Sequence, residues 1–262
     1  MNDLIFDTDS DESVLSHCVN CNQPIAAESR FCSYCGFAQA NNSDEPANEK
    51  FSTIKQIALF FLIEAIICCV ASFIVFFKTL AWSITFDIIL AIVAVVFFSV
   101  NWSRYRSLLV WHNFSLVKLL GYCIVAVISS FIVSFFVGWL NQSLFSKDFS
   151  YYAFYAPHKH GKELTILFVA VMPALFEELG YRGFLLGKFL QIVDKKQAIF
   201  ISAFLFAIMH TSFISLFWLI PFALWQSYIR IKENTLWYGV CIHFCFNFTV
   251  CMTEILRQNH HH

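Results

Sequence analysis

The stretch FEELGYR, residues 176–182, places two adjacent carboxylates and an arginine inside a long apolar segment. The surrounding segment, about residues 164–190, otherwise has the composition of a helix embedded in a membrane. Ionisable groups at membrane depth are energetically costly, and where they occur they usually serve a function. Glu177, Glu178 and Arg182 are therefore the first candidates for a functional site.

The composition is that of an α-helical membrane protein. Of the 262 residues, 58% are hydrophobic and only 13% are charged, whereas a soluble domain carries about 25% charged residues. So few charges cannot cover the surface of a soluble protein. The net charge is −1 and no basic stripe is present, so no nucleic-acid partner is expected.

Seven apolar segments approach the length of about 20 residues that a helix needs to cross a bilayer. They lie at about residues 56–77, 79–100, 119–140, 164–190, 197–211, 213–230 and 235–256. The fifth is short for a full crossing, and we expect it to meet the sixth at Thr211 and Ser212 inside the protein. Pro221 should kink the sixth helix. The predicted fold class is an all-α multi-pass membrane protein with about seven transmembrane helices, over residues 56–256.

The N-terminal part is polar and carries its own cysteine pattern. Residues 1–17 are acidic, lack the features of a signal peptide and are expected to be disordered. Two CxxC pairs follow at Cys18, Cys21, Cys32 and Cys35. This spacing fits a structural zinc ion held by four thiolates, with two disulfides or redox CxxC motifs as the alternatives. Residues 18–37 resemble the short zinc-ribbon modules of many prokaryotic proteins, and residues 38–55 form a linker.

Two independent features predict the orientation of the chain. Zinc-binding thiolates must stay reduced, which favours a cytoplasmic N-terminus. Lys and Arg concentrate at the segment ends on that same side, for example at Arg104, Lys188 and Arg230, in agreement with the positive-inside rule. We therefore expect a cytoplasmic (inner) membrane protein whose ribbon is free to meet a cytosolic partner.

Polar residues in the last four segments fall into pairs at helical spacing. Glu178 and Arg182 are four residues apart, as are His243 and Asn247, so each pair can share one helix face. Glu177 lies 17 residues before Asp194, where the chain turns, and His210 lies 16 residues after it. In an antiparallel hairpin Glu177 and His210 would lie at nearly the same depth.

Such a set of residues suits hydrolysis of an amide by water. A buried carboxylate can act as general base, while histidine and amide groups can donate hydrogen bonds to the oxyanion that forms. Alternatively, Glu177, His210 and His243 could bind a catalytic zinc ion with an open position for water.

Three motifs in order carry a family resemblance. They are EExxxR at residues 177–182, FxxxH at residues 206–210 and HxxxN at residues 243–247. Over about residues 160–256 the chain resembles the CPBP family of intramembrane proteases, which includes the CAAX prenyl endopeptidases and the Abi proteins.

The resemblance implies a role for each motif residue. Glu177 and His210 would activate the water, His243 and Asn247 would stabilise the oxyanion, and Glu178 would pair with Arg182. It implies an intramembrane endopeptidase acting on a membrane-proximal peptide, with prenylated (CAAX-type) substrates among the candidates. Both metalloprotease and glutamate-protease mechanisms are argued for the family, and the sequence leaves the choice open.

Two rival functions remain at this point. A catalytically silent binding or scaffold protein would be expected to show a broken motif, and none is broken. A proton-coupled transporter could use Glu64, Asp87 and Glu177 as a relay, but it predicts inverted repeats that the sequence lacks. As part of a peptidase, Glu64 and Asp87 would line a water-filled entry or pair with an arginine.

Overall fold

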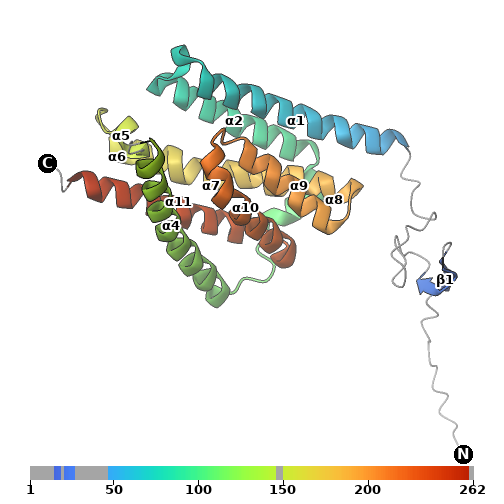
Figure 1. Cartoon of the computed structure of the whole chain (residues 1–262). Helices are drawn as coiled ribbons and strands as arrows, with labels where there is room; N and C mark the ends of the chain where they lie inside the picture. Colours follow the sequence, from blue (N-terminus) through green and yellow to red (C-terminus); the bar gives the residue numbers. More distant parts are fainter. Residues whose placement is uncertain (1–14, 19–20, 27–46, 146–149, 260–262) are drawn as a thin grey trace, which may run out of the picture. The chain divides into compact units, whose positions relative to one another are not determined.

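The computed structural model describes residues 15–18, 21–26, 47–145 and 150–259. The chain divides into two compact units, residues 1–54 and 55–262, and each is described by itself. Figure 1 shows the elements in chain order.

The N-terminal unit contains a short antiparallel hairpin. Strand β1 (Leu15–His17) pairs with β2 (Pro24–Ala26) so that Leu15 lies opposite Ala26. In the turn between them the backbone N–H of Cys21 donates to Sγ of Cys18 at 3.5 Å. Residues 15–17, inside the stretch expected to be disordered, form β1, while residues 1–14 and both Cys32 and Cys35 lie outside the described residues.

The second unit is helical, and six of its described helices are long and apolar enough to cross a membrane. The long helices are α1 (Ala47–Phe73), α2 (Leu80–Val100), α4 (Leu116–Phe145), the continuous helix of residues 161–192, α10 (Phe213–Glu233) and α11 (Trp237–Asn259). Short elements connect them: η2 (Val75–Phe77), α3 (Trp102–Tyr105), η3 (Arg106–Leu109) and α5 (Tyr151–Tyr155). Large apolar side chains stay exposed along the long helices, as expected where lipid is the solvent. The predicted multi-pass helical membrane fold is confirmed.

The fifth of the seven expected crossings differs from the other six. Helix α9 (Lys195–Ile208) has 14 residues, about 21 Å at 1.5 Å per residue, which is too short for a bilayer. It packs against α10, but Thr211 and Ser212 between the two helices are exposed rather than inside the protein. Thr211 has φ 51°, and this turn reverses the chain. Helix α10 continues through Pro221 as a single element.

The helix of residues 161–192 contains two π-helical stretches. In order it consists of α6 (Gly161–Thr165), η4 (Ile166–Val171), α7 (Met172–Glu177), η5 (Glu178–Leu185) and α8 (Leu186–Ile192). π-Helical turns are rare and frequently mark functional sites, because the wider turn changes the direction of the side chains. The second stretch begins between the two adjacent glutamates.

Two buried clusters hold these helices together. The first joins α1, α2, η5 and α9 around Phe60, Phe98, Phe184 and Phe206. A Cβ at Gly183 would lie 2.8 Å from the Phe98 ring, so a glycine is needed where η5 and α2 meet. The second cluster joins α4, α10 and α11, and α4 packs across α11 (Figure 1).

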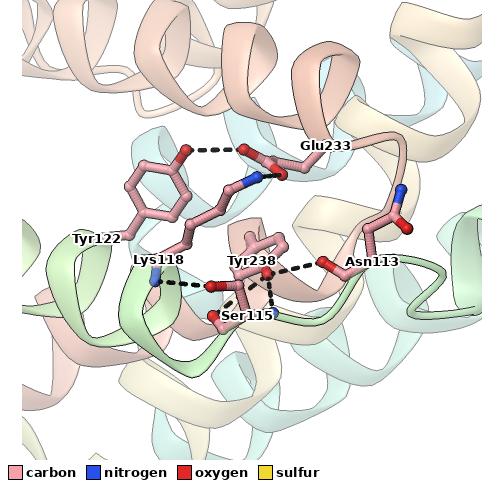
Figure 2. A network of polar contacts seen from close by, with 6 residues as sticks. All are labelled: Asn113, Ser115, Lys118, Tyr122, Glu233 and Tyr238. Atoms are coloured by element: carbon pink, nitrogen blue, oxygen red, sulfur yellow. Dashed lines mark hydrogen bonds and ion pairs between the residues drawn. The ribbon is translucent and has the colours of Figure 1, made fainter.

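A polar network ties the start of α4 to the α10–α11 turn (Figure 2). Lys118 Nζ lies 2.7 Å from Glu233 Oε2, and the Tyr122 hydroxyl donates to Glu233 Oε1 at 3.0 Å. The Tyr238 hydroxyl accepts from the Ser115 backbone N–H at 2.8 Å. These contacts fix the end of α10 and the beginning of α11, the two helices that carry Gln226 and His243.

Candidate active site

The two adjacent glutamates lie in different surroundings. Glu177 ends α7 and Glu178 begins η5. The Glu178 side chain is 1% exposed, whereas the Glu177 side chain is 33% exposed and lines a cavity. The expectation that the two carboxylates have different environments, and hence different uses, follows directly from this geometry.

The cavity has a volume of about 150 Å³, enough for several waters at about 30 Å³ each. Its polar wall is formed by Glu64 on α1, Asp87 on α2, Glu177 on α7 and His210 after α9. The remaining wall is mainly apolar and includes Phe168, Met172, Pro173, Phe176 and Met209. The cavity is therefore an acidic pocket with room for several waters, and one imidazole lies in its wall.

His210 lies in the turn that follows α9, two residues beyond the end of the helix, and not on the helix as its segment of residues 197–211 predicted. Its Nδ1 is 3.2 Å from the Phe206 carbonyl oxygen, which marks Nδ1 as the donor and leaves Nε2 for other partners. Within the described residues, no hydrogen bond within 3.5 Å and no ion pair within 4.0 Å joins His210 to Glu177. Both groups line one cavity, so a molecule between them can contact both.

Glu178 forms a buried ionic cluster. Arg182 Nη1 lies 3.2 Å from Glu178 Oε1, with both side chains 1% exposed. The pair predicted from the four-residue spacing is therefore present. The Arg182 guanidinium also lies over the Phe206 ring, 4.1 Å from its centre, a cation–π contact that is strengthened by the lack of water.

His243 lies between the two glutamates. Its Nδ1 is 3.1 Å from Glu178 Oε1, and its Nε2 is 3.8 Å from Glu177 Oε2. The sequence had assigned Glu178 to Arg182 alone and Glu177 to His210, so the link from His243 to both carboxylates is new. A histidine that donates one ring N–H to a carboxylate is held in orientation by it.

Asn247 differs from its expected position. Its Nδ2 donates to the Val169 carbonyl oxygen at 2.9 Å, on the π-helical stretch η4. His243 and Asn247 do not line the cavity in this structure. The idea that both side chains point at one spot is therefore corrected: Asn247 braces η4 against α11.

Three residues near the site were missed or left without a role. The Tyr181 hydroxyl donates to Glu64 Oε2 at 3.1 Å, so Glu64 pairs with a phenol rather than with an arginine. Gln226 on α10 and Gly239 on α11 lie against Glu178. A lone amide in an otherwise apolar helix was the available sequence signal for Gln226.

A catalytic metal ion would need several His, Cys, Asp or Glu side chains close together. In the described part of the chain, no group of three or more His, Cys, Asp or Glu side chains is placed to hold a metal ion. Glu177, His210 and His243, the predicted zinc ligands, therefore do not converge as a metal centre requires. The arrangement instead separates a cavity with Glu177 and His210 from a packed cluster with Glu178 and His243.

Comparison with protein families finds matches for two parts of the chain. Residues 160–249 match the model described as Type II CAAX prenyl endopeptidase Rce1-like, and residues 17–39 match the zinc-ribbon domain. Comparison with curated proteins and with solved structures gives no match. The matched range holds all three motifs, from Glu177 to Asn247, and leaves α1, α2 and α4 outside it. The chain therefore contains a region, residues 160–249, that matches the Rce1-like CAAX prenyl endopeptidase family, and a zinc-ribbon domain near its N-terminus.

Proposed function

We propose that the protein is an intramembrane endopeptidase in which Glu177 and His210 activate a water molecule for attack on a peptide bond. The observation that carries this proposal is the cavity itself, because Glu177 and His210 both line it and are not in contact with each other. A water between them would have an acceptor on either side. The family match supports peptide hydrolysis as the reaction class.

The proposed reaction needs only the protein's own side chains. The Glu177 carboxylate takes a proton from the water, and the oxygen attacks the carbonyl carbon of the peptide. His243, held by Glu178 at Nδ1 and protonated on both ring nitrogens, would donate from Nε2 to the oxyanion as charge develops. Glu177 then returns the proton to the leaving nitrogen, the C–N bond breaks, and a carboxylate and an amine are released.

Asn247 has a different role in this scheme from the one that the family resemblance implies. Its Nδ2 is already bonded to Val169, so it would have to exchange that bond for the substrate. We propose that Asn247 mainly holds η4 in place, with His243 as the principal donor. Asn247→Asp would remove both the bond to the Val169 carbonyl and any donation to the oxyanion, so its cleavage rate tests whether this amide is needed at all.

The substrate class follows from the setting. We propose a peptide anchored at the membrane, with a prenylated C-terminus of the CAAX type as the first candidate, because the matched family bears that name. Cleavage of one peptide with and without its prenyl group, in liposomes containing the full chain, tests this. Equal rates for both forms would show that the substrate must lie close to the membrane but does not need a prenyl group.

The basic test of activity compares two matched substitutions. Glu177→Gln removes the base while keeping the size of the side chain, and general-base catalysis contributes about 10²–10⁴-fold. Glu163→Gln makes the same change at an exposed position on α6 and should leave the rate unchanged. Full cleavage by Glu177→Gln protein would refute the proposed mechanism.

The zinc ribbon and the orientation complete the proposal. We propose one structural zinc ion bound by Cys18, Cys21, Cys32 and Cys35, of which Cys18 and Cys21 already lie in one tight turn. We also propose a cytoplasmic N-terminus in the inner membrane. Metal analysis of purified protein should give one zinc per chain, and none after Cys18→Ser with Cys21→Ser.

A further inference from the structure

Helix α10 holds one amide in the packed cluster behind the active site. Gln226 is 0% exposed and faces Glu178. Its orientation is assigned from the hydrogen-bond pattern: with Nε2 toward Glu178, it donates to Oε2 at 3.0 Å, to Oε1 at 3.1 Å and to the Gly239 carbonyl at 3.3 Å. The opposite orientation would set the amide oxygen against three acceptors.

Gly239 on α11 supplies the space for this contact. A Cβ at position 239 would lie 2.7 Å from Glu178 Oε2 and 3.1 Å from the Gln226 amide. The first distance is too short for the carboxylate to stay in place, and the second would require the amide to shift by a few tenths of an ångström. The Glu178 carboxylate is therefore enclosed by the backbone of α11 on one side and by the amide of α10 on another.

The partners of Glu178 are divided unequally between its two oxygens. His243 and Arg182 both lie at Oε1, at 3.1 and 3.2 Å, whereas the Gln226 amide donates to both Oε1, at 3.1 Å, and Oε2, at 3.0 Å. Arg182 lies within ion-pair distance, but its Nη1 and Nη2 make no hydrogen bond in the described structure. Gln226 therefore supplies the directional bond that stops the carboxylate from rotating about its own axis.

A fixed Glu178 carboxylate in turn fixes the imidazole of His243. With Nδ1 donating to Oε1, the Nε2 atom points toward Glu177. If the carboxylate turned, the Nδ1 contact would be lost, and a buried imidazole would have to find another partner. Residues that hold such a carboxylate–histidine pair usually contribute about 10–100-fold to activity at metal sites, and the same geometry applies here.

We propose that Gln226 and Gly239 are positioning residues of the active site, which lock Glu178 against Nδ1 of His243 and so aim Nε2 at the reacting centre. The assignment rests on the proposed peptidase function. It gives α10, which carries none of the three motifs, a defined part in the site.

Two near-isosteric substitutions separate positioning from simple packing. Gln226→Met keeps the volume and removes the donor, so kcat should fall about 10–100-fold with KM changed less than about twofold.

Gln226→Glu keeps the volume and donates only when the introduced carboxyl is protonated. Its rate relative to wild type should therefore rise as the pH falls. The charged groups around this position are Glu178 and Arg182 on η5 and His243 on α11, with Arg230 one turn further along α10.

The matched control is Gln191→Met on α8. Gln191 is partly buried, whereas Gln226 is fully buried, and it donates to the Tyr105 hydroxyl and the Gly187 carbonyl, both at 3.0 Å. It does not line the cavity. This variant should keep kcat and the pH profile of the wild type. Gly239→Ala should reproduce the loss of kcat seen in Gln226→Met by displacing the carboxylate instead of the amide.

A second readout does not depend on cleavage. In full-length protein labelled with ¹⁵N-histidine, the His243 signals can be identified by their loss in His243→Gln. Gln226→Met should shift the Nδ1 resonance of His243, and Gln191→Met should not. This experiment would still report on positioning if the wild-type protein cleaved no test peptide, so failure of the peptidase proposal is distinguishable.

Two results would overturn the inference. One is a Gln226→Met protein with wild-type kcat, pH profile and His243 resonances. The other is a loss of activity that only parallels loss of folded protein in both Gln226 variants, with unchanged His243 resonances in the folded fraction. Either would reduce Gln226 to a space-filling residue.

Discussion

Glu177 and Glu178 are neighbours in the sequence, yet one faces a cavity and the other lies in a packed cluster. The cavity side holds Glu177 and His210 with space between them, while the cluster side binds Glu178 to Arg182, His243 and Gln226. Space and an unfilled hydrogen-bonding capacity suit a group that must meet water and substrate. Complete pairing suits a group that must stay in place.

The two glutamates should differ most in how much their removal lowers the stability of the protein. Removing one partner of a buried ion pair leaves an uncompensated charge and costs about 3–5 kcal/mol. Glu178→Ala should therefore lower the thermal midpoint of the detergent-solubilised protein strongly, since it leaves Arg182 buried. Glu177→Ala, at a half-open position, should lower it little. Equal losses in the two variants would contradict the division into cavity and cluster.

A smaller effect is expected at the far wall of the cavity. Tyr181→Phe removes the hydroxyl that donates to Glu64, and a typical hydrogen bond within a protein contributes about 0.5–1.5 kcal/mol. We expect moderate destabilisation and a reduced cleavage rate, because Glu64 would be free to change the shape of the cavity. The matching variant is Glu64→Gln, which keeps an acceptor for the Tyr181 hydroxyl and should have a smaller effect on stability and on the cleavage rate. A more severe effect from Glu64→Gln would show that the charge of Glu64 matters and not only its contact.

The smallest effect is expected outside both regions. Lys118 pairs with Glu233 at 2.7 Å but is 47% exposed, and such surface pairs contribute about 0–1 kcal/mol. Lys118→Ala should leave cleavage within about twofold of wild type and change the thermal midpoint slightly. Screening by salt should remove even that difference. A large loss of activity would mean that the network in Figure 2 controls the position of α11.

The sequence predicted the fold class and the local pairs well, because both depend on short-range patterns. Apolar segments of membrane length gave the helices, and four-residue spacing gave the contact of Glu178 with Arg182. Counting from Asp194 placed Glu177 and His210 at one depth, and both line one cavity.

The remaining contacts depend on how helices pack and rotate, which spacing alone does not determine. The π-helical stretches η4 and η5 turn the side chains away from ideal helical directions, so the position of Asn247 against Val169 was not predictable. His243 reaches both glutamates only because α11 packs beside η4 and α7. Gln226 and Gly239 come from different helices and form no sequence motif together.

The most direct test of the division between the two glutamates is to measure cleavage and thermal stability of Glu177→Gln and Glu178→Gln proteins in the same liposome preparation. We predict that Glu177→Gln abolishes cleavage of a membrane-anchored peptide at an unchanged thermal midpoint, whereas Glu178→Gln lowers the midpoint and leaves residual cleavage. Retained cleavage by Glu177→Gln, or abolished cleavage by Glu178→Gln at full stability, would contradict the account.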